Sequence, residues 1–342
     1  MKKKILVTGG TGYIGSHTAV ELIEDGFEVA IIDNLYNSEA VVADRIKEIT
    51  GIKPQLEVFD LCEQEKLNTF FRKNKNIAAI IHFAAYKAVG ESVNKPNEYY
   101  RNNLVSLINL LDAMKEFHVS HMVFSSSCTV YGQPEKLPVT EDAPMQPAIS
   151  PYGNTKQIGE EIIRDNCKAD KNIKAISLRY FNPIGAHPSG LIGELPRGVP
   201  ENLVPFITQT AAGLREELKV FGDDYDTPDG SCIRDYLHVV DLAKAHVIAV
   251  KRLIGGKNKS TFEIFNLGTG KGVSVLEAIK SFERVTGIKL KYRITERRAG
   301  DIEKIWADPS FANKELGWKN LLTLDEAMKT AWQWEKNIRK KT

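Results

Sequence analysis

Apolar runs of strand length alternate with helix-length segments along the first half of the chain. The runs are rich in β-branched residues, and in order they read KILVTG, EVAIID, QLEVFD, AAIIHFA, HMVFSSS and AISLRYF. Continuous apolar strands separated by helices are typical of a parallel sheet that is buried on both faces. The pattern therefore predicts an α/β fold, built as a Rossmann-type doubly wound parallel sheet.

The regular alternation ends after AISLRYF. The next stretch, PIGAHPSGLIGELPRGVPEN, is rich in proline and glycine and predicts an ordered loop region where a second unit begins. Farther on, the strand-like FEIFNLG and the helical pattern of residues 274–286 resemble a return to the first unit. We expect a first domain of residues 1–181, with a return near residues 235–286, and a smaller α/β domain formed mainly by residues 182–342.

One predicted helix lacks a polar face. Residues 102–114, NNLVSLINLLDAM, are apolar on nearly every side, so the helix has to be covered all round. The sheet covers one side, and we expect a partner subunit to cover the other. This predicts a homodimer, with burial by the same chain as the alternative.

Composition narrows the class of protein. With 342 residues, of which 42% are apolar and 26% charged, the chain can form two domains. The net charge is +2, and no basic run exceeds three residues, which argues against nucleic acid or a membrane surface as partner. The apolar run after MKKK is too short for a signal peptide, and no later run is long enough to span a membrane. The four cysteines show no CxxC spacing, so we expect no metal site and a reduced, cytoplasmic protein.

The first strand leads into a glycine-rich turn. In KILVTGGTGYIGS, Gly9, Gly12 and Gly15 follow the strand and open a helix, where backbone N–H groups can approach a pyrophosphate. The second strand ends at Asp33, about 20 residues later, where a carboxylate can accept hydrogen bonds from ribose hydroxyls. The same carboxylate would repel a 2′-phosphate, and no arginine follows it directly. The turn and Asp33 together predict NAD as the cofactor.

Other strand ends point to the same edge of the sheet. Asp60 ends the third strand, and Phe83, Ala84 and Ala85 end the fourth. Carboxyl ends of strands are where a doubly wound sheet binds its ligand. The two small alanines would leave room for a flat cofactor.

A candidate catalytic set follows from the stretch SPYGNTK. Tyr152 and Lys156 are four residues apart, so they share one face if a helix starts at Pro151. A nearby ammonium lowers the pKa of a phenol, and Ser127, at the end of a strand, can hydrogen-bond the reacting oxygen. We expect these three side chains to move a proton while a hydride passes to NAD⁺.

A linked series of motifs resembles the extended short-chain dehydrogenase/reductase superfamily and, within it, the UDP-glucose 4-epimerase family. The motifs cover nearly the whole chain: VTGGTGYIGSH, IDNL, HFAAYKAVGES, SSSCTVYG, SPYGNTK, RYFNPIGAHPSG, IRDYLHVVDLA, NLGTG and RRAGDIEKIWAD. In that family the tyrosine removes the proton of the 4-hydroxyl as hydride leaves C4 for NAD⁺. The 4-ketose then turns over, and the hydride returns to its other face. The resemblance implies interconversion of UDP-glucose and UDP-galactose.

The resemblance also assigns residues to roles. Ser127, Tyr152 and Lys156 match the family's catalytic positions. The cofactor-binding positions are those at the strand ends and on the catalytic helix: Gly9, Gly12, Tyr13, Ile14, Gly15, Asp33, Asn34, Asp60, Leu61, Phe83, Ala84, Ala85, Lys87, Asn102, Tyr152, Lys156 and Phe181. The positions that hold the UDP-sugar are Ser127, Asn182, Asn202, Leu203, Phe221, Arg234, Arg298, Asp301 and Ile305. Arginines suit a diphosphate because of their bidentate geometry.

The choice of sugar turns on Ile305, where a small residue in the family admits a 2-acetamido group and a bulky aromatic one excludes it. Isoleucine matches neither pattern, and its branched side chain is stiff. We expect UDP-glucose and UDP-galactose as substrates, with UDP-N-acetylglucosamine and UDP-N-acetylgalactosamine as the alternative. Two other functions are alternatives. A 4,6-dehydratase would need an Asp-Glu pair where this chain has Cys128 and Thr129, and an inactive NAD-binding regulator would not need the intact catalytic set.

Overall fold

The core of the protein is a seven-stranded parallel sheet, seen here in a computed structural model that describes residues 2–298 and 301–340. The strand order is β11-β6-β5-β4-β1-β2-β3, and every neighbouring pair is parallel. The bounds are β1 (Lys4–Thr8), β2 (Glu28–Asp33), β3 (Gln55–Val58), β4 (Ile77–His82), β5 (His121–Ser125), β6 (Lys174–Tyr180) and β11 (Phe262–Leu267). The first six strands overlap the six apolar runs, which confirms the predicted α/β fold.

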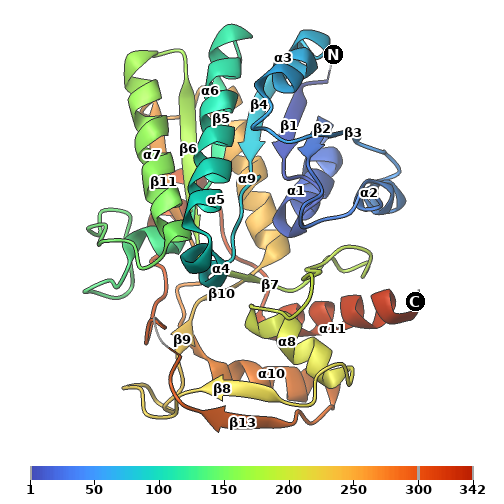
Figure 1. Cartoon of the computed structure of the whole chain (residues 1–342), viewed down its shortest axis with the longest axis vertical. Coiled ribbons are helices and arrows are strands. Elements are labelled where there is room, and N and C mark those ends of the chain that lie inside the picture. Colours follow the sequence, from blue (N-terminus) through green and yellow to red (C-terminus); the bar gives the residue numbers. More distant parts are fainter. Residues whose placement is uncertain (1, 299–300, 341–342) are drawn as a thin grey trace.

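Helices cover both faces of this sheet (Figure 1). Alternate residues of a strand point to opposite faces, so Ile5 and Val7 pack in one core and Leu6 in the other. The first core is closed by α1 (Tyr13–Glu24), α2 (Val42–Thr50), α9 (Val239–Ile254) and the short η3 (Ala312–Leu316). The second is closed by α3 (Gln64–Lys73), α6 (Ser106–Glu116) and α7 (Pro151–Ala169). Because both faces are covered, the central strands β1, β2 and β4 are mainly apolar and buried along their length.

The carboxyl edge of the sheet contains a topological switch point. Strand β1 pairs with β2 on one side and with β4 on the other. The connection after β1 therefore leads to one side of β1, and the connection after β3 leads back to the other side. The backbone continues this pairing past the strands, since the N–H of Gly9 donates to the Ile32 carbonyl and that of Phe83 to the Thr8 carbonyl. Open α/β sheets bind ligands in the crevice that such a divergence leaves.

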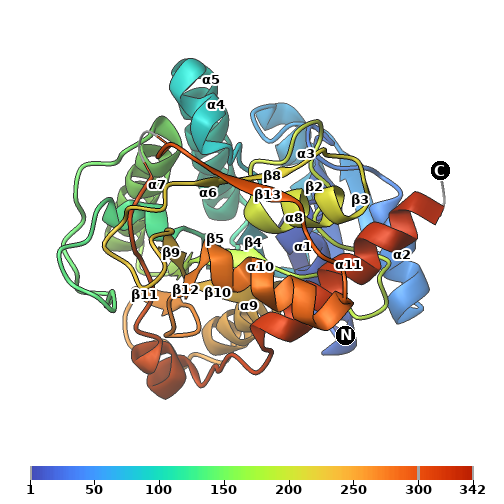
Figure 2. The same cartoon turned by 90° about the horizontal axis from the view of Figure 1, so that it is seen from below.

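A smaller layer lies below the large sheet in Figure 1, and Figure 2 shows it from beneath. Its helices are α8 (Leu203–Ala211), α10 (Val275–Thr286) and α11 (Leu324–Lys340). Its strands form three pairs: β7 (Asn182–Ile184) with β10 (Tyr236–His238), β8 (Leu218–Phe221) with β13 (Tyr292–Thr295), and β9 (Ile233–Arg234) with β12 (Val273–Ser274). Residues from α8, β8, α10 and α11 share one hydrophobic core.

The chain returns to the large sheet after the first part of the smaller layer. Strand β11 pairs with β6, and α9 packs against α1. Helix α10 behaves differently from the expectation, because its buried residues Ala278, Ile279 and Phe282 pack in the core of the smaller layer. The predicted return therefore has to be corrected for residues 275–286. Local periodicity marks α10 as amphipathic, but it does not say which layer receives the apolar side.

The apolar helix of residues 102–114 is divided in the structure. It consists of η1 (Arg101–Val105), a π-helical turn, and of α6, after the short helices α4 (Val89–Asn94) and α5 (Pro96–Tyr100). The side chains of Leu107, Leu110 and Leu111 are buried within the chain. Those of Val105 and Ile108 are 36% and 42% exposed, so one side of the helix stays uncovered.

Candidate active site

The glycine-rich turn brings the chain close to itself. Gly9 has φ of +70°, and a Cβ there would lie 2.8 Å from the backbone N of Ala84. A Cβ on Gly15 would lie 2.2 Å from the Gly9 carbonyl oxygen. Gly12 is the N-cap of α1 and offers no side chain to the first N–H groups of the helix. The turn therefore leaves these donors available to an anion, which is what a pyrophosphate requires.

Asp33 links this turn to the loop after β2 through hydrogen bonds. Its carboxylate accepts hydrogen bonds from the backbone N–H of Thr11 (3.1 Å) and of Leu35 (2.9 Å) and from the Ser38 hydroxyl (3.0 Å). A carboxylate can accept about four hydrogen bonds, so one position is left for a ribose hydroxyl. The side chain thus shapes the cofactor region as well as offering a contact.

The remaining predicted cofactor positions follow strands of the large sheet or lie on α1, η1 and α7. The Asn34 side chain donates to the Asp60 carboxylate over 2.9 Å, which links the ends of β2 and β3. The thiol of Cys62, next to Leu61, reaches the carbonyl of Asn102 at 3.8 Å. Phe83 packs against the ring of His246 on α9, with centroids 4.6 Å apart.

The catalytic candidates meet where β5 ends and α7 begins. Ser127 precedes the short helix η2 (Cys128–Tyr131), and Ser150 caps α7 by accepting from the N–H of Gly153. The ammonium of Lys156 donates to the carbonyl of Ser125 over 2.7 Å and lies 5.8 Å from the centre of the Tyr152 ring. Tyr152 also interacts with the Ser127 hydroxyl. The helix therefore places the phenol and the ammonium side by side.

Burial dominates the electrostatics of this set. It raises the pKa of Tyr152 well above its ordinary value, and the interaction with Ser127 only partly opposes the rise. We expected Lys156 to lower the pKa of Tyr152, but in the protein without a cofactor the effect of burial is larger. Burial also lowers the pKa of Lys156 to about 8, against the favourable effect of Glu160. The phenol is consequently protonated at neutral pH in the protein alone.

Several predicted sugar-nucleotide residues gather in the smaller layer. The Asp301 carboxylate pairs with Arg298 at 2.6 Å and with Arg234 at 3.6 Å. The guanidinium of Arg298 also lies 5.5 Å from the centre of the Phe221 ring. This group offers two arginines from separate segments, which suits a diphosphate.

The other predicted sugar-nucleotide residues come from further segments of the chain. The backbone N–H of Asn182 donates to the Asp235 carbonyl, and Leu203 begins α8. Ile305 is 2% exposed and packs beside Phe181, with Cys128 at the edge of the same cluster. Ile305 therefore lies near the loop that carries Ser127, although the two residues are far apart in the sequence.

Residues 185–202 connect the two layers through side chains that sequence reasoning did not single out. Glu194 accepts from Lys87 (3.1 Å) and from Asn202 (2.6 Å). Arg197 donates to the carbonyls of Leu35, Tyr36 and Ser38, in the loop after Asp33. The Tyr13 hydroxyl donates to the Gly185 carbonyl over 2.6 Å. Proline and glycine marked this stretch only as a loop, and no local pattern indicates these distant partners.

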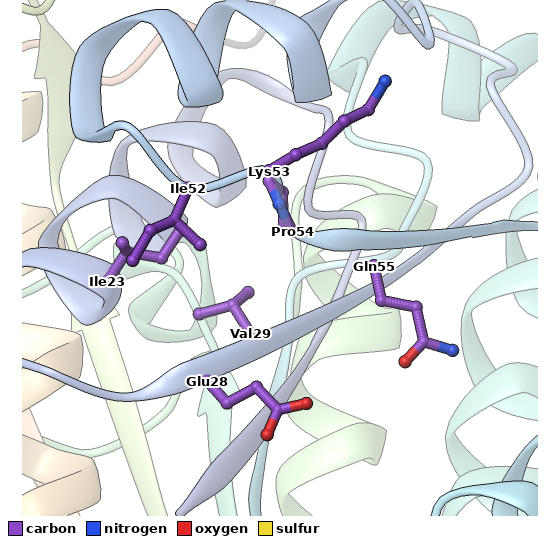
Figure 3. A pocket seen from close by; sticks show the side chains of 7 residues that line it. All are labelled: Ile23, Glu28, Val29, Ile52, Lys53, Pro54 and Gln55. Atoms are coloured by element: carbon purple, nitrogen blue, oxygen red, sulfur yellow. The ribbon is translucent and has the colours of Figure 1, made fainter. Parts of the chain in front are cut away.

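A pocket of about 400 Å³ lies elsewhere, between the amino ends of β2 and β3 and the end of α1 (Figure 3). It is lined by Ile23, Glu28, Val29, Ile52, Lys53, Pro54 and Gln55. None of the predicted site residues lines it, because they follow the carboxyl ends of the strands. In the part of the chain that the structure describes, no three His, Cys, Asp or Glu side chains are grouped to hold a metal, and no helix could span a membrane.

The fold and the edge of its sheet define a class of protein: a doubly wound sheet with serine, tyrosine and lysine at the carboxyl edge is the arrangement of the short-chain dehydrogenase/reductases. A family model described as GDP-mannose 4,6 dehydratase matches residues 6–331. UDP-glucose 4-epimerase of Bacillus subtilis is 50% identical, with 97% of this chain and 96% of that protein covered. The chain belongs to the UDP-glucose 4-epimerase family of isomerases.

Two solved structures resemble this one over almost their whole length. The UDP-glucose-4-epimerase of Stenotrophomonas maltophila, with bound NAD and formylated UDP-arabinopyranose, has a TM-score of 0.96 and 45% identity, covering 99% of this chain and 100% of that one. The UDP-glucose 4-epimerase of Bifidobacterium longum, in complex with NAD⁺ and UDP, has a TM-score of 0.93 and 47% identity, with 98% of each chain covered. Both carry the same arrangement of layers as the present chain.

Proposed function

We propose that this protein interconverts UDP-glucose and UDP-galactose with NAD as a bound cofactor. The observation that carries the proposal is the meeting of Tyr152, Lys156 and Ser127 at the carboxyl edge of the sheet. The family of the chain and the ligands of its two solved neighbours support the same activity.

The side chains divide the work of the reaction. NAD⁺, when bound, would supply the acceptor and donor for the C4 hydride, and its positive ring would favour the phenolate. Tyr152 accepts the proton of the 4-hydroxyl and gives it back, while Ser127 hydrogen-bonds the same oxygen. Lys156 stabilises the phenolate by its charge, and Arg234 and Arg298 bind the diphosphate. Because Tyr152 and Lys156 are buried, the charge of Lys156 acts on the phenol with little screening by water.

The geometry disfavours the two other functions. A 4,6-dehydratase has to remove a proton from C5 and protonate the leaving hydroxyl, but Cys128 and Thr129 occupy the places after Ser127 where its acid and base would stand. Burial also raises the pKa of the Cys128 thiol to about 12, so it is no base at neutral pH. A regulator without turnover has no need of the paired Tyr152 and Lys156.

The deciding experiment incubates the purified protein with UDP-galactose, with and without added NAD⁺, and resolves the nucleotide sugars by chromatography. We expect UDP-glucose to form until the two sugars reach equilibrium. If neither incubation yields UDP-glucose although the protein binds NAD, the protein is a regulator and the proposed function is wrong. A 4,6-dehydratase would instead yield a 4-keto-6-deoxy product.

Replacing Ile305 by alanine is expected to admit the larger sugars. Ile305 packs beside the loop of Ser127, and its removal opens space for a 2-acetamido group. Discrimination by one such side chain is commonly about 1–3 kcal/mol, so kcat/KM for UDP-N-acetylgalactosamine should rise about 10-fold or more relative to UDP-galactose. The wild type should strongly prefer UDP-galactose.

The matched control for this change is Val139→Ala, which shortens a buried side chain of the same cluster. It should lower stability without changing the ratio of the two substrates. Equal use of both sugars by the wild type, or no gain in Ile305→Ala, would show that Ile305 does not set the specificity.

A homodimer is part of the proposal. Val105 and Ile108 are three residues apart on one helix, so their exposed side chains are neighbours that a second copy could cover. Ile108→Lys should weaken the dimer at least about tenfold, because burying an unpaired ammonium is costly. Light scattering at a series of concentrations measures the change, and Leu321→Lys, at an exposed leucine elsewhere on the surface, is the control. An unchanged molar mass for Ile108→Lys would place the interface elsewhere.

A cytoplasmic location belongs to the same proposal. Cys62, Cys128, Cys167 and Cys232 are all free thiols, as is typical of a reducing compartment.

A further inference from the structure

Glu160 is a buried carboxylate on the same helix as Tyr152 and Lys156, and it has no part in the reaction described above. Glu160 lies on α7, four residues after Lys156 and eight after Tyr152, so the three side chains follow one face of the helix. Its exposed fraction is 0%. A buried charge is costly to maintain unless it is paired and fully hydrogen-bonded.

The hydrogen bonds of this carboxylate come from β6 and from Ser126, the residue that follows β5. Its Oε1 accepts from the Ser126 hydroxyl (2.6 Å), the Ser177 hydroxyl (2.8 Å) and the Nε of Arg179 (2.9 Å). Its Oε2 accepts from Nη2 of Arg179 over 2.6 Å. Arg179 in turn donates to the Tyr131 hydroxyl at 2.9 Å. The network holds α7 against the ends of both strands.

Ser126 links this network to the reacting groups. On one side of it, the carbonyl of Ser125 accepts from the Lys156 ammonium over 2.7 Å. On the other side, Ser127 carries the hydroxyl that interacts with Tyr152. The hydrogen bond from Ser126 to Glu160 therefore fixes the backbone that places both Lys156 and Ser127.

Glu160 also faces Lys156 as an anion. The other groups around the ammonium are Tyr152 on the same helix, the Phe124 ring on β5 at 5.0 Å, and His82 on β4. Burial lowers the pKa of His82 to about 3, so this ring is neutral, and the Tyr152 phenol is protonated. Glu160 raises the pKa of Lys156 against the effect of burial.

We propose that Glu160 is a positioning residue for the epimerase reaction, which holds the Ser125–Ser127 segment through Ser126 and supplies the negative charge that keeps Lys156 protonated. The inference rests on the proposed function. A merely structural role would stabilise the fold without affecting the proton on Lys156.

Glu160→Gln tests the two roles, because it keeps the shape and an acceptor oxygen but removes the charge. We expect kcat with UDP-galactose to fall about 10- to 100-fold while KM changes less than about threefold. Without the anion the pKa of Lys156 falls, so Lys156 loses its proton at lower pH. The alkaline limb of the kcat profile should then move to lower pH by about one unit or more.

The matched control is Glu263→Gln. Glu263 forms a similar two-bond ion pair with Arg252, at 2.7 and 2.8 Å, between β11 and α9 and away from the catalytic set. We expect it to lower Tm but to leave the pH profile unchanged. If Glu160→Gln lowers Tm with the profile of the wild type, Glu160 is structural and the inference is wrong.

A direct readout separates this inference from the proposed function. NMR titration of the Lys156 side chain in the NAD-loaded protein should show a lower pKa in Glu160→Gln, whether or not UDP-galactose turns over. An unchanged Lys156 titration would overturn the inference, whereas absent turnover in the wild type would overturn the function.

If Glu160→Gln does not fold, Ser126→Ala removes one hydrogen bond of the network and should lower kcat about tenfold at unchanged KM. An unchanged kcat in that variant would contradict the positioning role.

Discussion

Tyr152→Phe is expected to lower kcat for UDP-galactose by about 10²- to 10⁴-fold, the usual contribution of a positioned acid or base. The variant loses one hydroxyl, the group that exchanges the proton of the 4-hydroxyl. The ring keeps its place, since it is buried and its exposed fraction is only 9%. Stability and NAD binding should therefore change little. Steady-state kinetics, thermal unfolding and cofactor content of the purified variant measure the three quantities.

Tyr180→Phe provides the comparison, because it removes the hydroxyl of a second buried tyrosine near the set. That hydroxyl is bonded to the Ser125 hydroxyl at 2.6 Å. We expect its loss to cost less than about tenfold, since Tyr180 has no assigned proton transfer. Near-normal turnover in Tyr152→Phe would remove Tyr152 from the proposed reaction.

Asp33→Ala is expected to weaken NAD binding on the order of 10²-fold, with a much smaller effect on the UDP-sugar. The change removes the predicted ribose contact and also leaves the N–H groups of Thr11 and Leu35 without their acceptor. Hydrogen bonds to a charged group are commonly worth about 1.5–3 kcal/mol each, and a loss of 2.7 kcal/mol is about 100-fold in affinity. Calorimetric titration of cofactor-free protein with NAD⁺ and with UDP measures both affinities.

Ser38→Ala is a milder change at the same site and serves as the comparison for Asp33→Ala. It removes only one of the three hydrogen bonds to the carboxylate, so the loss of NAD affinity should be intermediate. If Asp33→Ala weakens NAD⁺ and UDP equally, the carboxylate supports the whole fold and not the cofactor site in particular.

The sequence by itself determined the features that depend on neighbouring residues. The period of apolar positions located the strands of the large sheet, because a strand buried on both faces has to be apolar along its length. The helix of Tyr152 and Lys156 could be predicted from their spacing and from Pro151, since a separation of four residues places side chains on one face of any helix. Motifs spread along the chain were enough to predict the family.

Only the tertiary structure decided the features that depend on distant segments. Helix α10 joins the smaller layer, Arg197 reaches the carbonyls of the loop after Asp33, and Glu160 is held by Ser126, Ser177 and Arg179. Burial likewise reverses the effect expected for the pKa of Tyr152. A local pattern reports the period and the polarity of one segment. The surface that a side chain meets, and the water it loses, depend on how the other segments pack around it.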